Sequence, residues 1–520
     1  MAAVAPFLIV SVIVVSILII LMSLILLIKF QHKDDATQAW LPKIVVLFGF
    51  YLVFGVALLM PYDVANRDGG GISMQTLWMI ALISVAAMVL VIIPFAYCYY
   101  EAQGVDTAEH TRGCCERQFM QAFCYTLAFA VVVLVLNVIL YATPANTAEV
   151  PVVALRLDKD GMSPMCDSFA PFPMPNNDPE VCDLGGCSKF GESFTWDIPV
   201  TYFVYLFALL SFIGWWFFFI FAGVGLVALP LDLINDFRTR PHPMKAEVYR
   251  EKSEEIYKRA SELHAEAKAL AEEIVTDTGA GARMLRTRLN ELENNVFFLH
   301  RDYDILKISK EFSKSNPLWW ILKLILGILG LVLSIMWILH ICLFMLQKRG
   351  EEIDPFLNKI FEKASDVGGG AFPLFGILLY AIFVFYLQWA VIKGNFKFGV
   401  RVLIIRVFPM EPGKTLMSAF LANLWVLLLC TFPLVQFVAQ ALPEYARYTA
   451  IETLYGGQIR YLRGFKIFWG KNVFLYLLLS FAALTLPIAL LCPNSQKKAL
   501  KEKIEERIRQ GDRARPGKAR

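Results

Sequence analysis

Charge is scarce in this sequence. Asp, Glu, Lys and Arg make up 18% of the 520 residues, whereas 57% are hydrophobic. A soluble chain of this length usually carries more charge and forms several domains. The composition therefore excludes an ordinary soluble protein, and we expect no nucleic-acid partner.

Catalytic and cofactor-binding motifs are missing as well. The chain has no P-loop, dinucleotide fingerprint, HExxH pair, CxxC pair or nucleophile elbow, and its six histidines are scattered. We therefore predict that the protein is not an enzyme and holds no cofactor or metal. Acids are nearly absent from the centres of the apolar runs, which argues against an ion-coupled pump. Passive or partner-driven transport remains open.

The sequence does contain a series of long apolar runs. A helix of about 20 apolar residues crosses the ~30 Å hydrocarbon layer of a membrane. The predicted spans are 7–29, 43–61, 76–99, 119–142, 200–228, 317–346, 372–392, 416–441 and 470–491. We therefore predict an all-α polytopic membrane helix bundle of about nine transmembrane helices, surrounded by the lipid bilayer.

Charges around the spans predict the orientation of the chain. No charged side chain precedes the first span, and Lys29, Lys33 and Lys43 follow it closely. By the positive-inside rule the N-terminus lies outside or in a lumen, and nine crossings leave the C-terminus in the cytosol. The start lacks the basic region of a signal peptide, so we expect the first span to be retained. The expected location is the plasma membrane or an endolysosomal membrane.

These spans divide the chain into six parts. The parts are transmembrane helices one to four (1–142), an outer loop (143–199), transmembrane helix five (200–236), a cytosolic hairpin (237–316), transmembrane helices six to nine (317–492) and a basic cytosolic tail (493–520). The tail is either a short basic helix on the inner leaflet or a disordered flank.

The outer loop is rich in Pro, Asn, Asp and Gly, which predicts a mostly irregular segment. It contains Cys166, Cys182 and Cys187. In an oxidising compartment one disulfide is expected, and three pairings are possible. A bridge between Cys182 and Cys187 would close a small loop across the stretch "CDLGGC".

The segment 237–316 shows the clearest helical periodicity. Apolar residues recur at spacings of three and four on both sides of the helix-breaking stretch "TDTGAG". The two seams are Tyr249, Ile256, Ala260, Leu263, Ala267, Leu270 and Ile274, then Leu285, Leu289, Leu292, Val296, Leu299, Tyr303 and Leu306. They predict a coiled-coil hairpin. Either each seam only covers the other or extends spans five and six as a stalk, or the hairpin is a platform for cytosolic trafficking or signalling proteins. If the seams only cover each other, partner binding falls to the outward charged faces.

The stretch "LLMPYDVANRDGGG" at 58–71 places an acid at the end of the second span. Pro61 cannot donate a backbone hydrogen bond and three glycines follow, so we expect the helix to end there. Asp63 then has two possible roles. It orders the helix terminus by binding local amides or Arg67, or it lies buried in a conduction path. We expect the structural role.

Other polar side chains occur within the predicted spans. Asn137, Gln388 and Asn423 are amides that would line a substrate path if the bundle contains one. Polar residues inside membranes are expensive and often functional, so these three are candidates for transport. His340 is alone in its span, which favours a buried hydrogen-bonding role over a ligand role.

Several stretches together resemble one family. They are "FQHKDDATQAWLPK" (30–43), "MPYDVAN" (60–66), "GVGLVALPLDLINDFRTRP" (223–241), "FPMEPGKTLMSAFL" (408–421) and "LRGFKIFWGKNVF" (462–474). The sequence resembles the limb-region/LIMR family, named for the lipocalin-interacting membrane receptor, and is most similar to its plant and protist branch. The resemblance spans nearly the whole chain.

The resemblance implies a nine-span protein with its N-terminus outside. Members are linked to ligand uptake at the cell surface, lysosomal cobalamin export and receptor signalling, without established enzymatic chemistry. Asp63 and Asn66 match the family's "DVAN" stretch, and Asp34 and Asp35 match its first inner loop. Asp232 stands where related sequences tend to place another residue. The variable outer loop is where ligand identity would be set.

We therefore predict a non-enzymatic multispan receptor or adaptor. Its outer loops would bind an unidentified ligand, and its hairpin would bind a cytosolic partner. The alternative is a transporter, or a transport escort, for a small molecule that passes through the bundle. A structural scaffold without a ligand is a third possibility. A continuous polar cavity would favour transport, whereas a sealed bundle with an exposed hairpin would favour the adaptor.

Overall fold

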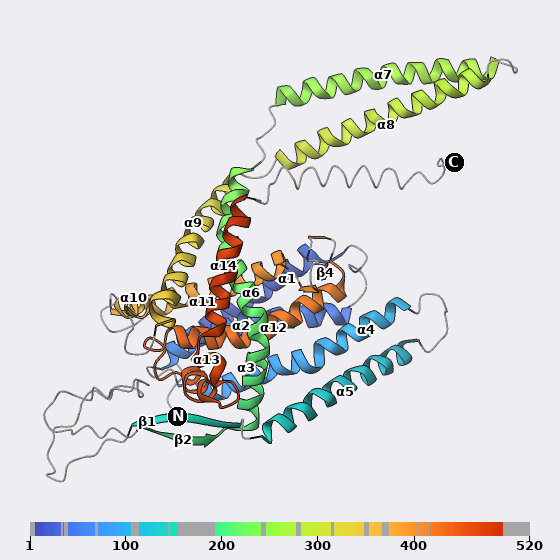
Figure 1. Cartoon of the computed structure of the whole chain (residues 1–520). Helices are drawn as coiled ribbons and strands as arrows, with labels where there is room; N and C mark the ends of the chain where they lie inside the picture. The colour runs from blue at the N-terminus through green and yellow to red at the C-terminus, as the bar shows by residue number, and fades with distance from the viewer. Residues whose placement is uncertain are drawn as a thin grey trace, which may run out of the picture. The chain divides into compact units, whose positions relative to one another are not determined.

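The structure of the chain is a computed structural model (Figure 1). It describes residues 6–32, 35, 40–67, 71–105, 114–143, 146–153, 193–240, 246–276, 282–313, 317–347, 353–366, 374–398, 400–402, 405–408, 410, 412–413 and 415–491. Within these ranges nine helical spans are long and apolar enough to cross a membrane. They match the nine predicted spans in order, which confirms the all-α polytopic bundle.

The bounds of the elements follow the chain order. The spans are α1 (Pro6–Phe30), α2 (Trp40–Asn66), α3 (Met74–Ala87) continuing through η2 (Met88–Ile92) into α4 (Ile93–Val105), α5 (Cys114–Tyr141), α6 (Tyr202–Arg238), α9 (Pro317–His340) continuing into η4 (Ile341–Met345), α11 (Leu374–Phe398), α12 (Met417–Ala441) and α14 (Val473–Leu491). The remaining helices are α7 (Ala246–Thr276), α8 (Ala282–Ser313), α10 (Phe356–Asp366), η5 (Glu452–Gln458), η6 (Ile459–Tyr461) and α13 (Lys466–Gly470). The elements η2, η4 and η5 are π-helical, and η6 is a 3₁₀ helix.

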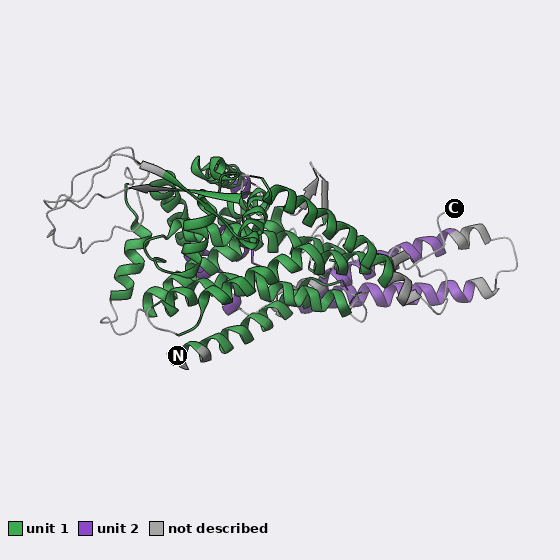
Figure 2. Ribbon diagram, turned by 90° about the horizontal axis from the view of Figure 1, so that it is seen from below, with its two compact units in different colours: residues 1–229, 330–487 green, residues 230–329, 488–520 purple. Residues whose placement is uncertain are grey.

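Two compact units make up the chain (Figure 2). The first comprises residues 1–229 and 330–487, and the second comprises 230–329 with the chain from 488 onward. In the first unit α12 is the central helix and packs against α2, α4 and α11. Its span is 89% buried, whereas that of α5 is only 11% buried. Helix α5 is therefore peripheral, with most of its surface available to lipid.

Small residues and one buried amide hold α6 inside the first unit. Ser211 Oγ and Trp215 Nε1 both donate hydrogen bonds to Gln436 Oε1 of α12, at 2.5 and 2.9 Å. Further along α6, the backbone at Gly225 lies directly against the carbonyl of Ala390 in α11. Close backbone approach through small residues is how helices gain packing energy inside a membrane, where burial from water contributes little.

Two short antiparallel hairpins accompany the helices. Strand β1 (Thr147–Val153) pairs with β2 (Ser193–Pro199), and β3 (Val400–Val402) pairs with β4 (Ile405–Phe408). The two ends of the outer loop, predicted to be mostly irregular, thus form a short β-hairpin stem, and the residues between the strands lie outside the described part of the chain. The two ends carry the β-branched and aromatic residues that favour strands. The predicted disulfide cysteines, Cys166, Cys182 and Cys187, and the basic tail 493–520 lie outside the described residues.

Strand β1 is attached to the segment that precedes α13. Ala148 forms a bridge with Leu462, and the Arg463 backbone N–H donates to the Thr147 carbonyl at 3.0 Å. Glu149 pairs with Arg463 at 2.6 Å and with Lys466 at 3.2 Å. The hydrogen bond from Lys466, aided by the charges of Lys466 and Arg463, holds the pKa of Glu149 below its ordinary value of 4.5.

The second unit contains the helical hairpin α7–α8 and the adjoining ends of two spans. Lys323 Nζ pairs with Asp236 Oδ2 at 2.8 Å and lies over the Trp320 ring. Lys323 lies near one end of the predicted span 317–346, where a long side chain can extend toward the membrane surface. Its charge is instead compensated by an acid of α6, because the end of α6 packs against the start of α9 within this unit.

The close approach of α6 and α11 predicts a strong effect of added volume. Gly225→Ala places a methyl group against the Ala390 carbonyl, and we expect it to lower the free energy of unfolding by about 1–3 kcal/mol. Gly55→Ala is the matched control, because a Cβ there meets nothing within 4 Å. It should be neutral or slightly stabilising, since alanine favours a helix. Thermal unfolding of the two purified variants in detergent measures the difference, and equal melting temperatures would contradict this packing.

The ion pairs of Glu149 predict a pH dependence for the attachment of β1. Because the folded-state pKa is lowered, the carboxylate stabilises this contact above its ordinary pKa of 4.5. That contribution is lost as the pH falls through the lowered value. Hydrogen exchange at the Arg463 amide, corrected for its intrinsic rate, should therefore accelerate on acidification. Glu149→Gln should remove this pH dependence, and an unchanged profile in the variant would refute the role of the carboxylate.

Candidate functional site

Asp63 lies in the last turn of α2 and is only 3% exposed. Its Oδ2 atom accepts hydrogen bonds from Trp78 Nε1 at 2.8 Å and from the Ile451 N–H at 3.0 Å. Its Oδ1 atom accepts one from the Ala450 N–H at 3.3 Å. These two amides begin the helical stretch that continues into η5. The carboxylate therefore caps a helix N-terminus, where a negative charge is favourable.

The structure corrects the expected end of the second span. Helix α2 does not stop at Pro61 but continues through it to Asn66. A proline is tolerated within a membrane helix when neighbouring groups bind the backbone atoms that it leaves free. Asn66 closes the following turn, since its amide group both donates to and accepts from the backbone of Ile72, at 2.8 and 3.0 Å. Asp63 consequently lies inside the bundle, away from water.

Arg67 also connects distant parts of the chain. Its Nη1 atom donates to the carbonyls of Tyr445 and Arg447, at 3.1 and 3.4 Å. Together with Asp63, it fixes the segment after α12 to the end of α2. The sequence indicated that Asp63 orders this end, but it suggested local amides as partners. The amide partners come from about 390 residues further along the chain, which spacing along the sequence could not reveal.

A second carboxylate has the same role at the start of α12. Asp35 is 6% exposed, and its Oδ2 accepts a hydrogen bond from the Met417 N–H at 3.1 Å. Its Oδ1 accepts one from the Tyr100 hydroxyl at 3.0 Å. Beside it, the His32 N–H donates to the carbonyl of Thr415 at 2.9 Å. Two of the stretches that carry the family resemblance, 30–43 and 408–421, are therefore in contact.

The opposite end of α12 is bound by a histidine. His340 is fully buried, and its Nε2 donates to the Ala441 carbonyl at 2.7 Å. The expected hydrogen-bonding role of His340 is thereby confirmed. Together, Asp35 and His340 satisfy backbone groups at both ends of the most buried helix of the bundle.

The remaining candidate residues lie on separate helices. Asn137 is on α5, Gln388 on α11 and Asn423 on α12, each 1% exposed. Asn423 donates to the carbonyls of Phe408 and Ala419, whereas neither amide atom of Asn137 or Gln388 has a partner among the described residues. Among the described residues, no hydrogen bond joins Asn137, Gln388 and Asn423 to one another. Asp232 is buried on α6, in the second unit.

One further buried amide, Asn395, was not among the residues predicted from the sequence. Asn395 follows Gln388 by seven residues on α11, is fully buried and also has two unpartnered amide atoms among the described residues. A spacing of seven places both amides on one helix face. That spacing was the available signal, but the predicted span ended at 392 and therefore excluded Asn395.

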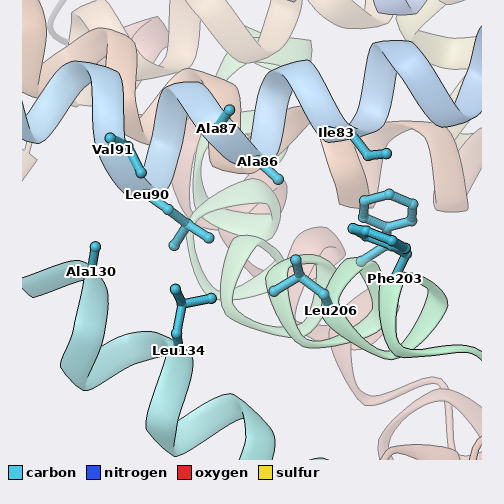
Figure 3. A pocket seen from close by; sticks show the side chains of 10 residues that line it. Ile83, Ala86, Ala87, Leu90, Val91, Ala130, Leu134, Phe203 and Leu206 are labelled. Carbon is cyan, nitrogen blue, oxygen red and sulfur yellow. The ribbon is translucent and has the colours of Figure 1, made fainter.

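A lateral pocket of about 150 Å³ lies in the first unit (Figure 3). It is lined by Ile83, Ala86, Ala87, Leu90, Val91, Ala130, Leu134, Phe203, Leu206 and Phe207. These residues belong to α3, η2, α5 and α6. All are apolar, so this pocket suits a hydrocarbon group and offers nothing to a polar solute.

A second pocket lies within the helical hairpin. It has a volume of about 330 Å³ and is lined by Ser253, Ile256, Tyr257, Ala260, Val296, Leu299, His300 and Tyr303. The predicted seam is buried or half-buried on α7 from Tyr249 to Leu270. On α8, however, Val296 and Tyr303 are 42% and 46% exposed, so their expected place inside the seam is wrong. The two helices leave a groove there, which we call the hairpin groove.

The capping role of Asp63 can be tested by two substitutions. Asp63→Leu leaves three donors without an acceptor, and we expect a loss of about 3 kcal/mol or more in the free energy of unfolding. Asp63→Asn keeps one acceptor oxygen and should lose less, about 1–2 kcal/mol. Thermal unfolding and folded yield of the purified variants measure the series, with Asp197→Leu at an exposed acid as the control. If Asp63→Asn melts like the parent yet abolishes ligand uptake, the carboxylate serves transport instead.

Comparison with known proteins places the chain in a family. The family model described as LMBR1-like membrane protein matches residues 8–296 and 298–487. A LIMR family protein of Dictyostelium discoideum is 31% identical over 90% of this chain and 94% of its own length. LIMR family proteins of Oryza sativa subsp. japonica and Arabidopsis thaliana are 33% and 32% identical, over 91% and 90% of this chain and 93% and 92% of their own lengths.

No solved structure matches the chain. The relatives from Dictyostelium and from plants agree with the branch that the sequence motifs indicated. The similarity covers all nine candidate spans and the hairpin between the fifth and the sixth. The chain therefore belongs to the LIMR family of LMBR1-like multispan membrane proteins.

Proposed function

We propose that this LIMR family member is a non-enzymatic membrane receptor or adaptor. Its outer loop, 143–199, binds a ligand, and its hairpin, 237–316, binds a cytosolic trafficking or signalling protein. One span separates these segments, so they lie on opposite sides of the membrane, and the positive-inside rule assigns the hairpin to the cytosol. The plasma membrane or an endolysosomal membrane would hold the protein. Epitope tags in the two segments, tested by protease protection, check this topology.

The hairpin is the observation that carries the proposal. Helices α7 and α8 contain 31 and 32 residues, far more than the roughly 2–8 residues that usually connect neighbouring helices of a bundle. Surface ion pairs such as Arg250–Glu254 and Arg259–Glu255 contribute little to stability. The length and charge of the hairpin are therefore better explained by binding than by folding.

The hairpin groove supplies a site for such a partner. Tyr257 is 75% exposed at its edge, and Val296 and Tyr303 are also exposed. Exposed aromatic and aliphatic residues surrounded by charge are typical of surfaces that bind another protein. An amphipathic helix would fit between α7 and α8, with its apolar face toward Ile256 and Leu299.

The packing of the bundle also favours the adaptor. Helix α12 is almost completely buried, and its ends are bound by Asp35 and His340. The lateral pocket is apolar throughout. These features suit a bundle that is sealed against polar solutes.

Transport remains the second candidate because of the amides on α11. Gln388 and Asn395 are buried on one face of this helix, and none of their amide atoms has a partner in the described part of the chain. Unpaired amides in a membrane interior are unfavourable unless something binds them. A polar solute that crosses the bundle would provide that partner.

Substitution of the hairpin groove tests the adaptor. In the full chain, Val296→Asp and Tyr303→Asp should abolish co-purification of a cytosolic partner from native membranes, because each places a charge in the groove. Both residues are partly exposed, so folding should change by less than about 1 kcal/mol. Phe298→Asp is the control, since Phe298 is 49% exposed on the same helix and does not line the groove.

Two results would argue against the adaptor. One is an identical set of captured proteins from the parent, the groove variants and the control. The other is a loss of small-molecule flux in Gln388→Leu and Asn395→Leu at normal abundance, with flux intact in the groove variants. The second result would establish the transporter instead.

A further inference from the structure

We propose that the ends of α1 and α11, together with the β3–β4 hairpin, bind a phospholipid whose headgroup carries more than one phosphate group. The residues that would hold this headgroup, which we call the basic cluster, are Lys29, Lys393, Lys397, Arg401 and Arg406. The inference goes beyond the receptor or adaptor role and does not depend on it.

Two segments that are far apart in the sequence are joined at this end of the first unit. The Gly413 N–H donates to the Lys29 carbonyl at 3.0 Å, and the Thr415 N–H donates to the Phe30 carbonyl at 3.1 Å. The Phe30 ring packs against the Phe396 ring of α11, with 5.1 Å between their centroids. The end of α1 is therefore held against the end of α11 and against the segment that leads into α12.

These contacts bring lysines of two helices near one another. Lys29 is exposed, and its Nζ atom lies 5.8 Å from the centroid of the Phe30 ring, which packs on Phe396. Lys393 and Lys397 flank Phe396 on α11 and are half-buried. At a spacing of four residues the two are neighbours on the helix surface, where like charges repel. An anion with several charges, bound beside these helix ends, would offset that repulsion.

The β3–β4 hairpin adds two arginines at directly paired positions. Its register places Arg401 opposite Arg406. Like charges at opposed positions destabilise an antiparallel pair of strands, so a nearby negative charge would stabilise this hairpin. The planar guanidinium group of arginine binds phosphate oxygens through two parallel N–H groups. The pairing therefore suits a phosphate group.

The positive charge is concentrated in the two joined segments. Together, 29–43 and 393–414 contain eight Lys or Arg residues against three acids. One of these acids, Asp35, already accepts hydrogen bonds from the Met417 N–H and the Tyr100 hydroxyl. The segment 101–117 lies on the same side of the membrane, yet it contains four acids against two bases. The positive-inside rule acts on all short loops of one side, so it does not explain this concentration.

Lipid adjoins the basic cluster. Ile25 and Ile28 near the end of α1 are 63% and 66% exposed, and the α1 span is only 22% buried. Trp40, the first residue of α2, is 69% exposed, and Lys43 Nζ lies 5.0 Å from its ring centroid. Tryptophan gathers at the boundary between hydrocarbon and headgroups. A lipid bound here would have its phosphates at the basic cluster and its acyl chains along α1.

The number of basic residues selects the class of lipid. A headgroup with one negative charge, such as phosphatidylserine, would compensate only a small part of the five positive charges of the basic cluster. Basic sites at the cytosolic ends of membrane helices bind phosphorylated inositol headgroups, and the positive-inside rule assigns this end to the cytosol. One further charge-assisted contact with phosphate would favour the multiply phosphorylated lipid by about tenfold.

Photo-crosslinking of the full chain in phosphatidylcholine nanodiscs tests this assignment. The discs contain either a phosphatidylinositol bisphosphate or a phosphatidylserine, at equal total charge, with the same diazirine in the upper part of the acyl chain. After irradiation, peptide mapping should place the bisphosphate adducts on Ile25 and Ile28, in about tenfold excess over the phosphatidylserine adducts. Soluble inositol bisphosphate at the probe concentration should not displace the lipid, because it lacks the chains that contact α1.

A double variant and a matched control separate the basic cluster from general attraction of anionic lipids. Lys393→Gln combined with Lys397→Gln should lower the bisphosphate adducts by about tenfold. Lys252→Gln combined with Lys258→Gln removes the same charge from exposed positions of α7 and should leave the adducts unchanged. If the first double variant does not fold, Lys29→Gln at an exposed position should lower the adducts by about threefold.

Three results would overturn the proposal. The first is equal labelling of α1 by the two lipid probes at equal total charge, which would show attraction to any anionic lipid. The second is unchanged bisphosphate labelling in both Lys29→Gln and the α11 double variant. The third is complete displacement by an equal concentration of soluble inositol bisphosphate, which would make the ligand a free anion.

Discussion

Hydrogen bonding at the ends of α12 is the constraint on which the bundle depends. A helix buried among other helices has no water to bind the backbone groups that its first and last turns leave free. Asp35 accepts from the first turn, and His340 donates to the last carbonyl. Because these side chains come from the loop between α1 and α2 and from α9, burial of α12 requires that both be in place. Asp63 likewise accepts hydrogen bonds from the first amides of the helical stretch that follows α12.

This constraint explains why buried acids occur in a chain with so few charges in its spans. A carboxylate that accepts two or three hydrogen bonds from amide, indole or hydroxyl groups is stabilised without a cation. Both acids also lie near helix ends, where the aligned peptide dipoles favour negative charge. Asp35 and Asp63 belong to the stretches that carry the family resemblance, and their contacts give a physical reason for acids at these positions.

Some of this architecture follows from the sequence and some does not. The spans and the α7 half of the hairpin could be predicted, because hydrocarbon thickness and heptad spacing act locally on the chain. The end of α2 could not, since tertiary packing decides whether a membrane helix continues through a proline such as Pro61. The partners of Asp63, at Ala450 and Ile451, are likewise set by tertiary packing. The lateral pocket depends on the π-helical turn η2, for which the sequence gives no periodic signal.

The attachment of β1 has a consequence for how the outer loop communicates with the spans. The Thr147 carbonyl accepts a hydrogen bond from the Arg463 amide. The segment that leads to Arg463 contains η5 and η6. At the start of this segment, the Ile451 amide donates a hydrogen bond to Asp63 of α2. The β1–β2 sheet and the end of α2 are therefore connected through one segment of the chain, and a movement of β1 would act on the hydrogen bonds of the Asp63 carboxylate.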